Sequence, residues 1–181
     1  MKKKIRTYHP HEGERMEALA GAPLASFGRR ALAFYIDLFA SVALFIAIAV
    51  PIAILASKMG YLPKDVHLGF DFHEWYSVLF IVLYYGLATY WGNGRTLGKR
   101  LCKIRVVSLV EERITLWTAI ERALGYGASA LEFFFGFVQY FLHPNCQTVH
   151  DRIAETIVVD ERKEAAAVAG RPLGPEPVSS R

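Results

Sequence analysis

Cysteine is scarce in this chain of 181 residues, which contains only Cys102 and Cys146. Neither lies in a CxxC or CxxH pattern, so the sequence offers no disulfide framework and no zinc site, and we predict neither a metal nor a cofactor. Its basic residues flank apolar segments instead of forming one patch, which argues against binding to nucleic acid. With 53% hydrophobic residues, the composition indicates a single-domain membrane protein.

Charge is almost absent from Ala31 to Ala56, where Asp37 is the only charged residue in 26. At about 1.5 Å per residue, a helix of this length spans about 39 Å, enough to cross a hydrocarbon core of about 30 Å. The run begins some thirty residues into the chain and is too long for a signal peptide, so we predict a retained transmembrane helix. A carboxylate at membrane depth should face protein or water.

A basic pair precedes this run. Seven helical steps of about 100° place Arg30 on the face of Asp37, with Arg29 about 80° away. We predict that Arg30 pairs with Asp37 as an ion or proton site or as a structural charge pair; a basic anchor followed by a tolerated aspartate is the alternative. The same face carries small residues that allow close approach of another helix, namely Ala33, Ala40, Ser41 and Ala47.

A second span is predicted from Trp75 to Trp91, which has no charge and carries aromatic residues at both ends. Lysine and arginine number seven in residues 1–30, two in residues 57–74 and six in residues 92–115. By the positive-inside rule, both ends of this hairpin face the cytoplasm. We therefore predict a multi-pass protein of the plasma or inner membrane with both termini cytoplasmic.

The basic stretch after the second span resembles a phosphate-binding loop but does not meet its requirements. Asn93 stands where the first glycine is needed, and Arg100 stands where the Ser or Thr is needed. The cations of this loop are predicted to lie at the anionic cytoplasmic leaflet; they are Arg95, Lys99 and Arg100.

The third apolar region, Leu116–Leu142, contains polar residues and glycines at membrane depth: Glu121, Arg122, Gly125, Gly127, Glu132, Gly136 and Gln139. It either crosses the membrane once or bends near residues 125–129 into a re-entrant or interfacial hairpin. We favour the bend, because it returns residues 155–160 to the side of residues 103–109. Both stretches are strand-like, and pairing satisfies both backbones. Asp151 would then cap a turn or lie near the basic loop.

The predicted fold class is therefore an all-α membrane protein with two transmembrane helices, a bent third segment and a small cytoplasmic two-stranded β element. The chain divides into a flexible basic segment (residues 1–27), a membrane domain (28–160) and a disordered tail (161–181).

Three groups of residues together resemble the RDD family of small membrane proteins over about residues 26–160. The resemblance assigns the family arginine to Arg30 or Arg29 and the two family aspartates to Asp37 and Asp151. The family commonly has glycine where this chain has Glu155. The resemblance implies a transport role, with sodium/proton exchange reported for some members of the family. The groups are Arg29, Arg30, Ala33, Ile36 and Asp37; Gly94, Thr96, Gly98, Lys99, Ile104, Val106 and Val107; and Gln147, Thr148, His150, Asp151, Arg152, Ala154, Thr156, Val158 and Val159.

Two functions fit these observations. In the first, the protein is a transporter or transport component in which Asp37 exchanges a proton or small cation, in a homo-oligomer because one protomer has few polar groups. In the second, it is a non-catalytic accessory, assembly or scaffold subunit held to another membrane protein. An enzyme built on Cys146, His150 and Asp151 is not expected, because adjacent side chains on an extended strand point apart.

Overall fold

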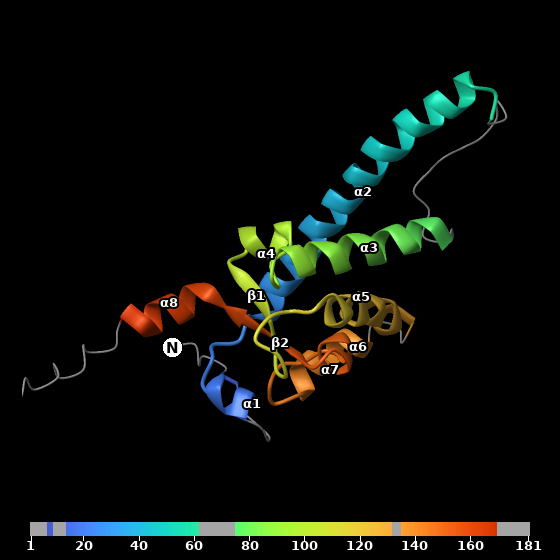
Figure 1. Ribbon diagram of the computed structural model, residues 1–181. Helices are drawn as coiled ribbons and strands as arrows, with labels where there is room; N and C mark the ends of the chain where they lie inside the picture. Colours follow the sequence, from blue (N-terminus) through green and yellow to red (C-terminus); the bar gives the residue numbers. More distant parts are fainter. Residues whose placement is uncertain (1–6, 9–13, 62–74, 132–134, 170–181) are drawn as a thin grey trace, which may run out of the picture.

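The computed structural model describes residues 7–8, 14–61, 75–131 and 135–169. Over these residues the protein is mostly helical, with one small sheet (Figure 1). In chain order the elements are α1 (Glu14–Ala18), α2 (Phe27–Lys58), α3 (Trp75–Trp91), α4 (Leu97–Leu101), β1 (Ile104–Ser108), α5 (Leu116–Leu131), α6 (Phe135–Leu142), α7 (Val149–Ile153), β2 (Thr156–Asp160) and α8 (Glu161–Ala169).

Helix α2 contains the first predicted span and extends beyond the other elements, which gather beside its N-terminal half (Figure 1). Among the described residues it is the helix that is long and apolar enough to cross a membrane, and only 11% of its most apolar stretch is buried. Large apolar side chains such as Ile52 (60% exposed) and Leu55 (60%) therefore face outward. Such exposure suits lipid or another membrane protein and would be unfavourable in water.

The other predicted elements are also present. Helix α3 has the bounds predicted for the second span, Trp75–Trp91. The two predicted strands form an antiparallel pair in which Val106 lies opposite Val158. All five residues of β2 are buried. Because a two-stranded ribbon is marginal alone, its stability depends on the helices packed around it.

Residues near the chain ends pack on this sheet, which differs from the predicted mobile segment (1–27) and disordered tail (161–181). Tyr8 is 1% exposed and Leu24 is 2% exposed, and both belong to an apolar cluster with β2 residues. Leu24 forms a β-bridge with Val159. Helix α8 occupies residues 161–169 of the predicted tail, and the remainder of that tail lies outside the described residues.

The predicted bend at residues 125–129 is not where α5 ends. The helix continues to Leu131, and α6 starts at Phe135; Glu132 lies between them, outside the described residues. Gly125 serves packing instead: a Cβ added there would lie 2.7 Å from Cβ of His150. Its missing side chain lets α7 approach α5, so the glycine that suggested a bend marks a close helix contact.

Candidate functional site

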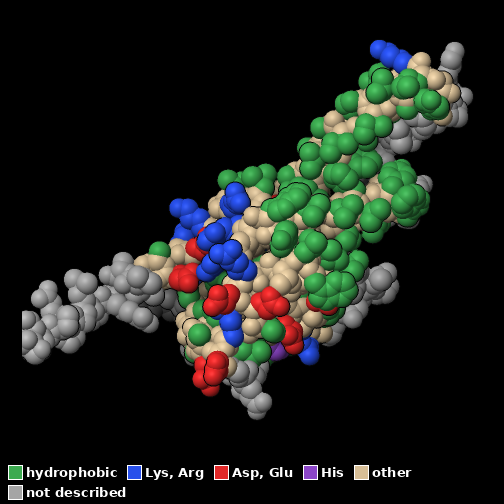
Figure 2. Space-filling view, viewed as in Figure 1, with side chains coloured by type: hydrophobic (Ala, Val, Ile, Leu, Met, Phe, Trp, Pro, Cys, Tyr) green, Lys and Arg blue, Asp and Glu red, His purple; other side chains and the backbone are tan. Residues whose placement is uncertain are grey.

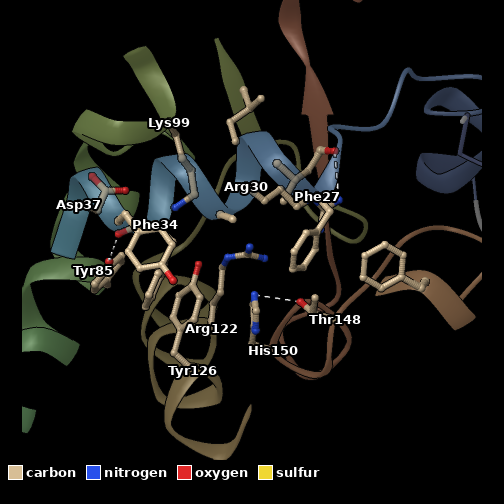
Figure 3. Close-up of a pocket in the computed structure, with 15 residues that line it drawn as sticks. Phe27, Arg30, Phe34, Asp37, Tyr85, Lys99, Arg122, Tyr126, Thr148 and His150 are labelled. Carbon is tan, nitrogen blue, oxygen red and sulfur yellow. Dashed lines mark hydrogen bonds between the residues drawn. The ribbon is translucent and has the colours of Figure 1, made fainter. Parts of the chain in front are cut away.

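A cavity of about 310 Å³ lies among α2, α4, α5, α7 and the sheet (Figure 3). It is enclosed mainly by aromatic and aliphatic side chains, and it combines these with several charged groups. Its lining is Phe27, Arg30, Ala31, Phe34, Tyr35, Asp37, Tyr85, Lys99, Ile104, Arg122, Tyr126, Phe141, Thr148, His150 and Val158. An apolar cavity with a few convergent polar groups is the usual form of a small-molecule site.

Asp37 is fully buried and receives its hydrogen bonds from the start of α4. The backbone N–H of Gly98 donates to its Oδ1 over 2.7 Å, and the Thr96 hydroxyl donates to its Oδ2. Helix α4 can come this close because Gly98 has no side chain: an added Cβ would lie 2.2 Å from the carbonyl oxygen of Ala33. Ala33, one of the small residues on this face of α2, is thus a point where α4 approaches closely.

Asp151 is the second buried carboxylate, and it binds two arginines from different helices. Arg30 Nη1 lies 2.7 Å from its Oδ2, and Arg122 Nη1 donates to its Oδ1. The backbone N–H of Thr148 also donates to Asp151 Oδ2, over 3.2 Å, so Asp151 caps the start of α7. One carboxylate therefore ties α2 and α5 to α7.

The predicted Arg30–Asp37 pair is wrong, because Arg30 is bound to Asp151 instead. Helical side chains tilt toward the N-terminus, so the Arg30 side chain leaves α2 in the direction away from Asp37. Seven residues also separate the two positions by about 10.5 Å along the axis. Among the described residues, Asp151 pairs with Arg30 and Arg122 and not with an arginine or lysine of the basic loop, so the predicted pairing there is also wrong.

The remaining predicted site residues separate into different environments. Arg29 pairs with Asp160 at 2.8 Å, and Arg95 pairs with Glu161 at 2.6 Å. Arg100 is exposed. Lys99 is only 5% exposed and lines the cavity, so the basic loop is not uniformly a surface feature.

Arg122 is the main residue whose partner the sequence did not predict. It is 3% exposed and lies midway along an apolar helix, where an arginine requires a counter-charge. This requirement predicts that Arg122 has a carboxylate partner. Which carboxylate it is depends on how α5 packs against α7, and the sequence does not show this. Arg122 Nη1 also lies 2.6 Å from the Thr156 hydroxyl at the start of β2.

His150 lies between Tyr126 and Thr148. Its ring centroid is 4.2 Å from that of Tyr126, and its Nε2 is 2.9 Å from the Thr148 hydroxyl. Burial lowers the pKa of His150 to about 3, aided by repulsion from Arg122, Arg30 and Lys99 and opposed by Asp151. The imidazole is therefore neutral in the folded protein near pH 7.

The pKa of Asp151 is also displaced. Burial alone would raise this pKa, but Arg122 and Arg30 outweigh burial and hold it well below its usual range. Asp151 therefore stays a carboxylate throughout the physiological range.

These shifts predict that acid destabilises the protein. His150 titrates near 6.5 when unfolded and near 3 when folded, so between these values the unfolded state binds more protons. Stability should therefore fall as pH falls, by about 1 kcal/mol between pH 7 and 5.5 from this residue. Thermal unfolding in mild detergent should show a smaller pH dependence for His150→Gln. Equal pH dependence in both proteins would contradict the assignment.

The described part of the chain contains no group of three or more His, Cys, Asp or Glu side chains that could hold a metal ion. His150 Nε2 lies 3.8 Å from Asp151 Oδ1, beyond hydrogen-bond distance. The expectation that the protein is not an enzyme stays a prediction.

Comparison with known proteins adds family evidence. The model of the RDD family matches residues 24–155, a range that contains Arg30, Asp37, Lys99, Arg122 and Asp151. The chain is similar to a Bacillus subtilis (strain 168) protein named "Uncharacterized protein YxaI", with 32% identity over 146 residues, 75% of this chain and 96% of that protein. No solved structure matches this chain.

Proposed function

This chain belongs to the RDD family, and we propose that it is a multi-pass transport-associated membrane protein in which Asp37 exchanges a proton or small cation. The observation that carries this proposal is the environment of Asp37: a fully buried carboxylate on an apolar helix, at the wall of a cavity. Ionisable groups within membrane helices commonly mark ion or proton pathways.

Asp37 differs from Asp151 in a way that suits it to exchange. The donors to Asp37 are the neutral Thr96 hydroxyl and the Gly98 N–H, whereas Asp151 binds two guanidinium groups. Within the described residues, no lysine, arginine or histidine nitrogen lies within 4.0 Å of Asp37. Asp37 therefore forms no ion pair with a described residue, whereas the two guanidinium groups hold Asp151 as a structural anion.

The titratable and charged groups that line the cavity with Asp37, or that interact with it electrostatically, belong to five elements. They are Arg30 on α2, Tyr84 and Tyr85 on α3, Lys99 and Cys102 on and after α4, Arg122 and Tyr126 on α5, and His150 on α7.

The distribution of charge supports an orientation in the membrane. Apolar side chains cover α2 and α3, whereas lysines and arginines gather near α4 and α8 (Figure 2). We propose that α2 and α3 span the bilayer, that α5 and α6 form the bent third segment, and that both termini are cytoplasmic. Labelling of an engineered Ser180→Cys from outside intact cells would contradict this orientation.

Asp37→Asn tests the coupling, because it keeps the shape of the side chain and removes its titratable charge. In reconstituted vesicles, we expect the proton flux carried by Asp37→Asn to be at least tenfold lower than that carried by wild type. Ser41→Ala is the matched control: Ser41 is buried one turn further along α2 and donates to Leu38, not to Asp37. A folded Asp37→Asn protein with undiminished flux would remove Asp37 from the mechanism.

The accessory or scaffold function is the second candidate, favoured by the exposed apolar length of α2. Among its outward residues, Ile46 is 50% exposed and Ile54 is 53% exposed. A second copy or another membrane protein could cover this surface as lipid does. Folded wild-type protein that carries no flux but purifies in a stable complex with a different protein would favour this function.

A further inference from the structure

We propose that the cavity binds a small amphipathic organic anion, with its carboxylate at Lys99 and its apolar part against the aromatic wall. This names a substrate class for the same site, and it rests on the proposed function only for the claim that the ligand is transported. Binding itself follows from the charge and shape of the cavity.

Lys99 is the residue that requires an anion. Its ammonium group has three donors, and its one hydrogen-bond acceptor among the described residues is the Thr96 hydroxyl, 3.4 Å from Nζ. No described carboxylate oxygen lies within 4.0 Å of Nζ. Figure 3 shows the side chain entering the cavity from α4. Asp37 reaches this ammonium group only through the Thr96 hydroxyl, so a bound carboxylate would satisfy the donors that the described residues leave unmet.

The two arginines strengthen the preference for an anion. Arg30 Nε and Arg122 Nε are both buried, and neither has a hydrogen-bond partner in the part of the chain that the structure describes. The lining thus carries three cations, Lys99, Arg30 and Arg122, against the carboxylate of Asp37, while Asp151, outside the lining, pairs with both arginines. One positive charge remains uncompensated, which favours a monoanion as the organic ligand and a proton as the species exchanged at Asp37.

The size and lining of the cavity define the rest of the ligand. Phe34 and Tyr126 lie with ring centroids 5.6 Å apart, and Phe27 and Phe141 lie 5.0 Å apart. All four line the cavity, so an apolar group would be enclosed by rings. A volume of about 310 Å³ is at the small end for ligand sites, which suits an aryl group or short acyl chain and excludes a whole phospholipid.

The geometry also links this anion to the proton at Asp37. The Thr96 hydroxyl donates to Asp37 and accepts from Lys99, so one hydroxyl connects the carboxylate to the ammonium group. Protonation of Asp37 removes the negative charge on the far side of that hydroxyl and leaves Lys99 with less compensation. Anion and proton should therefore bind cooperatively, each raising the affinity for the other.

Calorimetric titration of the full-length protein in an uncharged detergent tests the proposal with 2-naphthoate and its neutral counterpart 2-naphthamide. We expect wild type to bind naphthoate at least tenfold more tightly than naphthamide. Lys99→Met keeps the apolar stem and should remove this preference. Lys163→Met, on α8 outside the cavity lining, should keep it.

Equal binding of the two probes to wild type would overturn the proposal, and this comparison does not depend on any variant folding. An unchanged preference in folded Lys99→Met would also overturn it. The proposed function fails separately: preferential naphthoate binding together with undiminished flux in Asp37→Asn would support the anion site and reject proton coupling at Asp37. Loss of flux in Asp37→Asn together with equal binding of the two probes by wild type would support proton coupling at Asp37 and reject the anion site.

Discussion

Asp151→Asn is expected to destabilise the folded protein by about 3 to 5 kcal/mol, because it leaves two buried guanidinium groups without their counter-charge. Asp151 is fully buried, and the side chains of Arg30 and Arg122 are 12% and 4% exposed. Solvent therefore cannot replace the lost carboxylate. The same residue caps α7 through the Thr148 N–H, so the substitution also weakens that helix start.

The thermal unfolding midpoint in mild detergent and the folded yield measure this effect. Glu164→Gln is the control, because Glu164 is 44% exposed in its ion pair with Arg105, and exposed pairs contribute little. Adding Arg122→Met to Asp151→Asn should recover part of the loss, since it removes one stranded charge. An Asp151→Asn protein as stable as the Glu164→Gln control would show that the two ion pairs are not structural.

Local sequence signals predicted the elements well. The uncharged run between Trp75 and Trp91 set both ends of α3, and β-branched residues placed β1 and β2. Their pairing followed from the need to satisfy two isolated strands. Even the departure at Glu155 has a structural counterpart: its φ is 44°, a left-handed conformation that favours glycine.

The charge partners could not be predicted in the same way. Arg30 and Asp151 are 121 residues apart in sequence, and their contact depends on how α7 packs against α2 and α5. Helical spacing identified Asp37 as a neighbour of Arg30 but ignored the tilt of side chains toward the N-terminus. The cavity could not be predicted from the sequence either. A basic loop is expected at the surface, but α4 turns Lys99 of this loop inward to line the cavity.

Gly98→Ala is expected to destabilise the protein by about 3 kcal/mol, because it affects both the packing of α4 on α2 and the anchoring of Asp37. A Cβ at this position would lie 2.2 Å from the carbonyl oxygen of Ala33 and 3.1 Å from its Cα. These are backbone atoms, so no side-chain rotation relieves the overlap. If α4 moves away, the 2.7 Å hydrogen bond from Gly98 N–H to Asp37 Oδ1 is lost.

Gly28→Ala provides the matched control, since it makes the same chemical change in α2 at a position with nothing within 4 Å of the added Cβ. Alanine is the better helix former, so this variant should be as stable as wild type or more stable by up to about 1 kcal/mol. Thermal unfolding midpoints of the two variants measure the difference. Because Gly98 positions Thr96 and Lys99 as well as Asp37, partly folded Gly98→Ala should also lose the preference for naphthoate over naphthamide. Retention of that preference together with wild-type stability would show that α4 does not need this close contact with α2 to form the cavity.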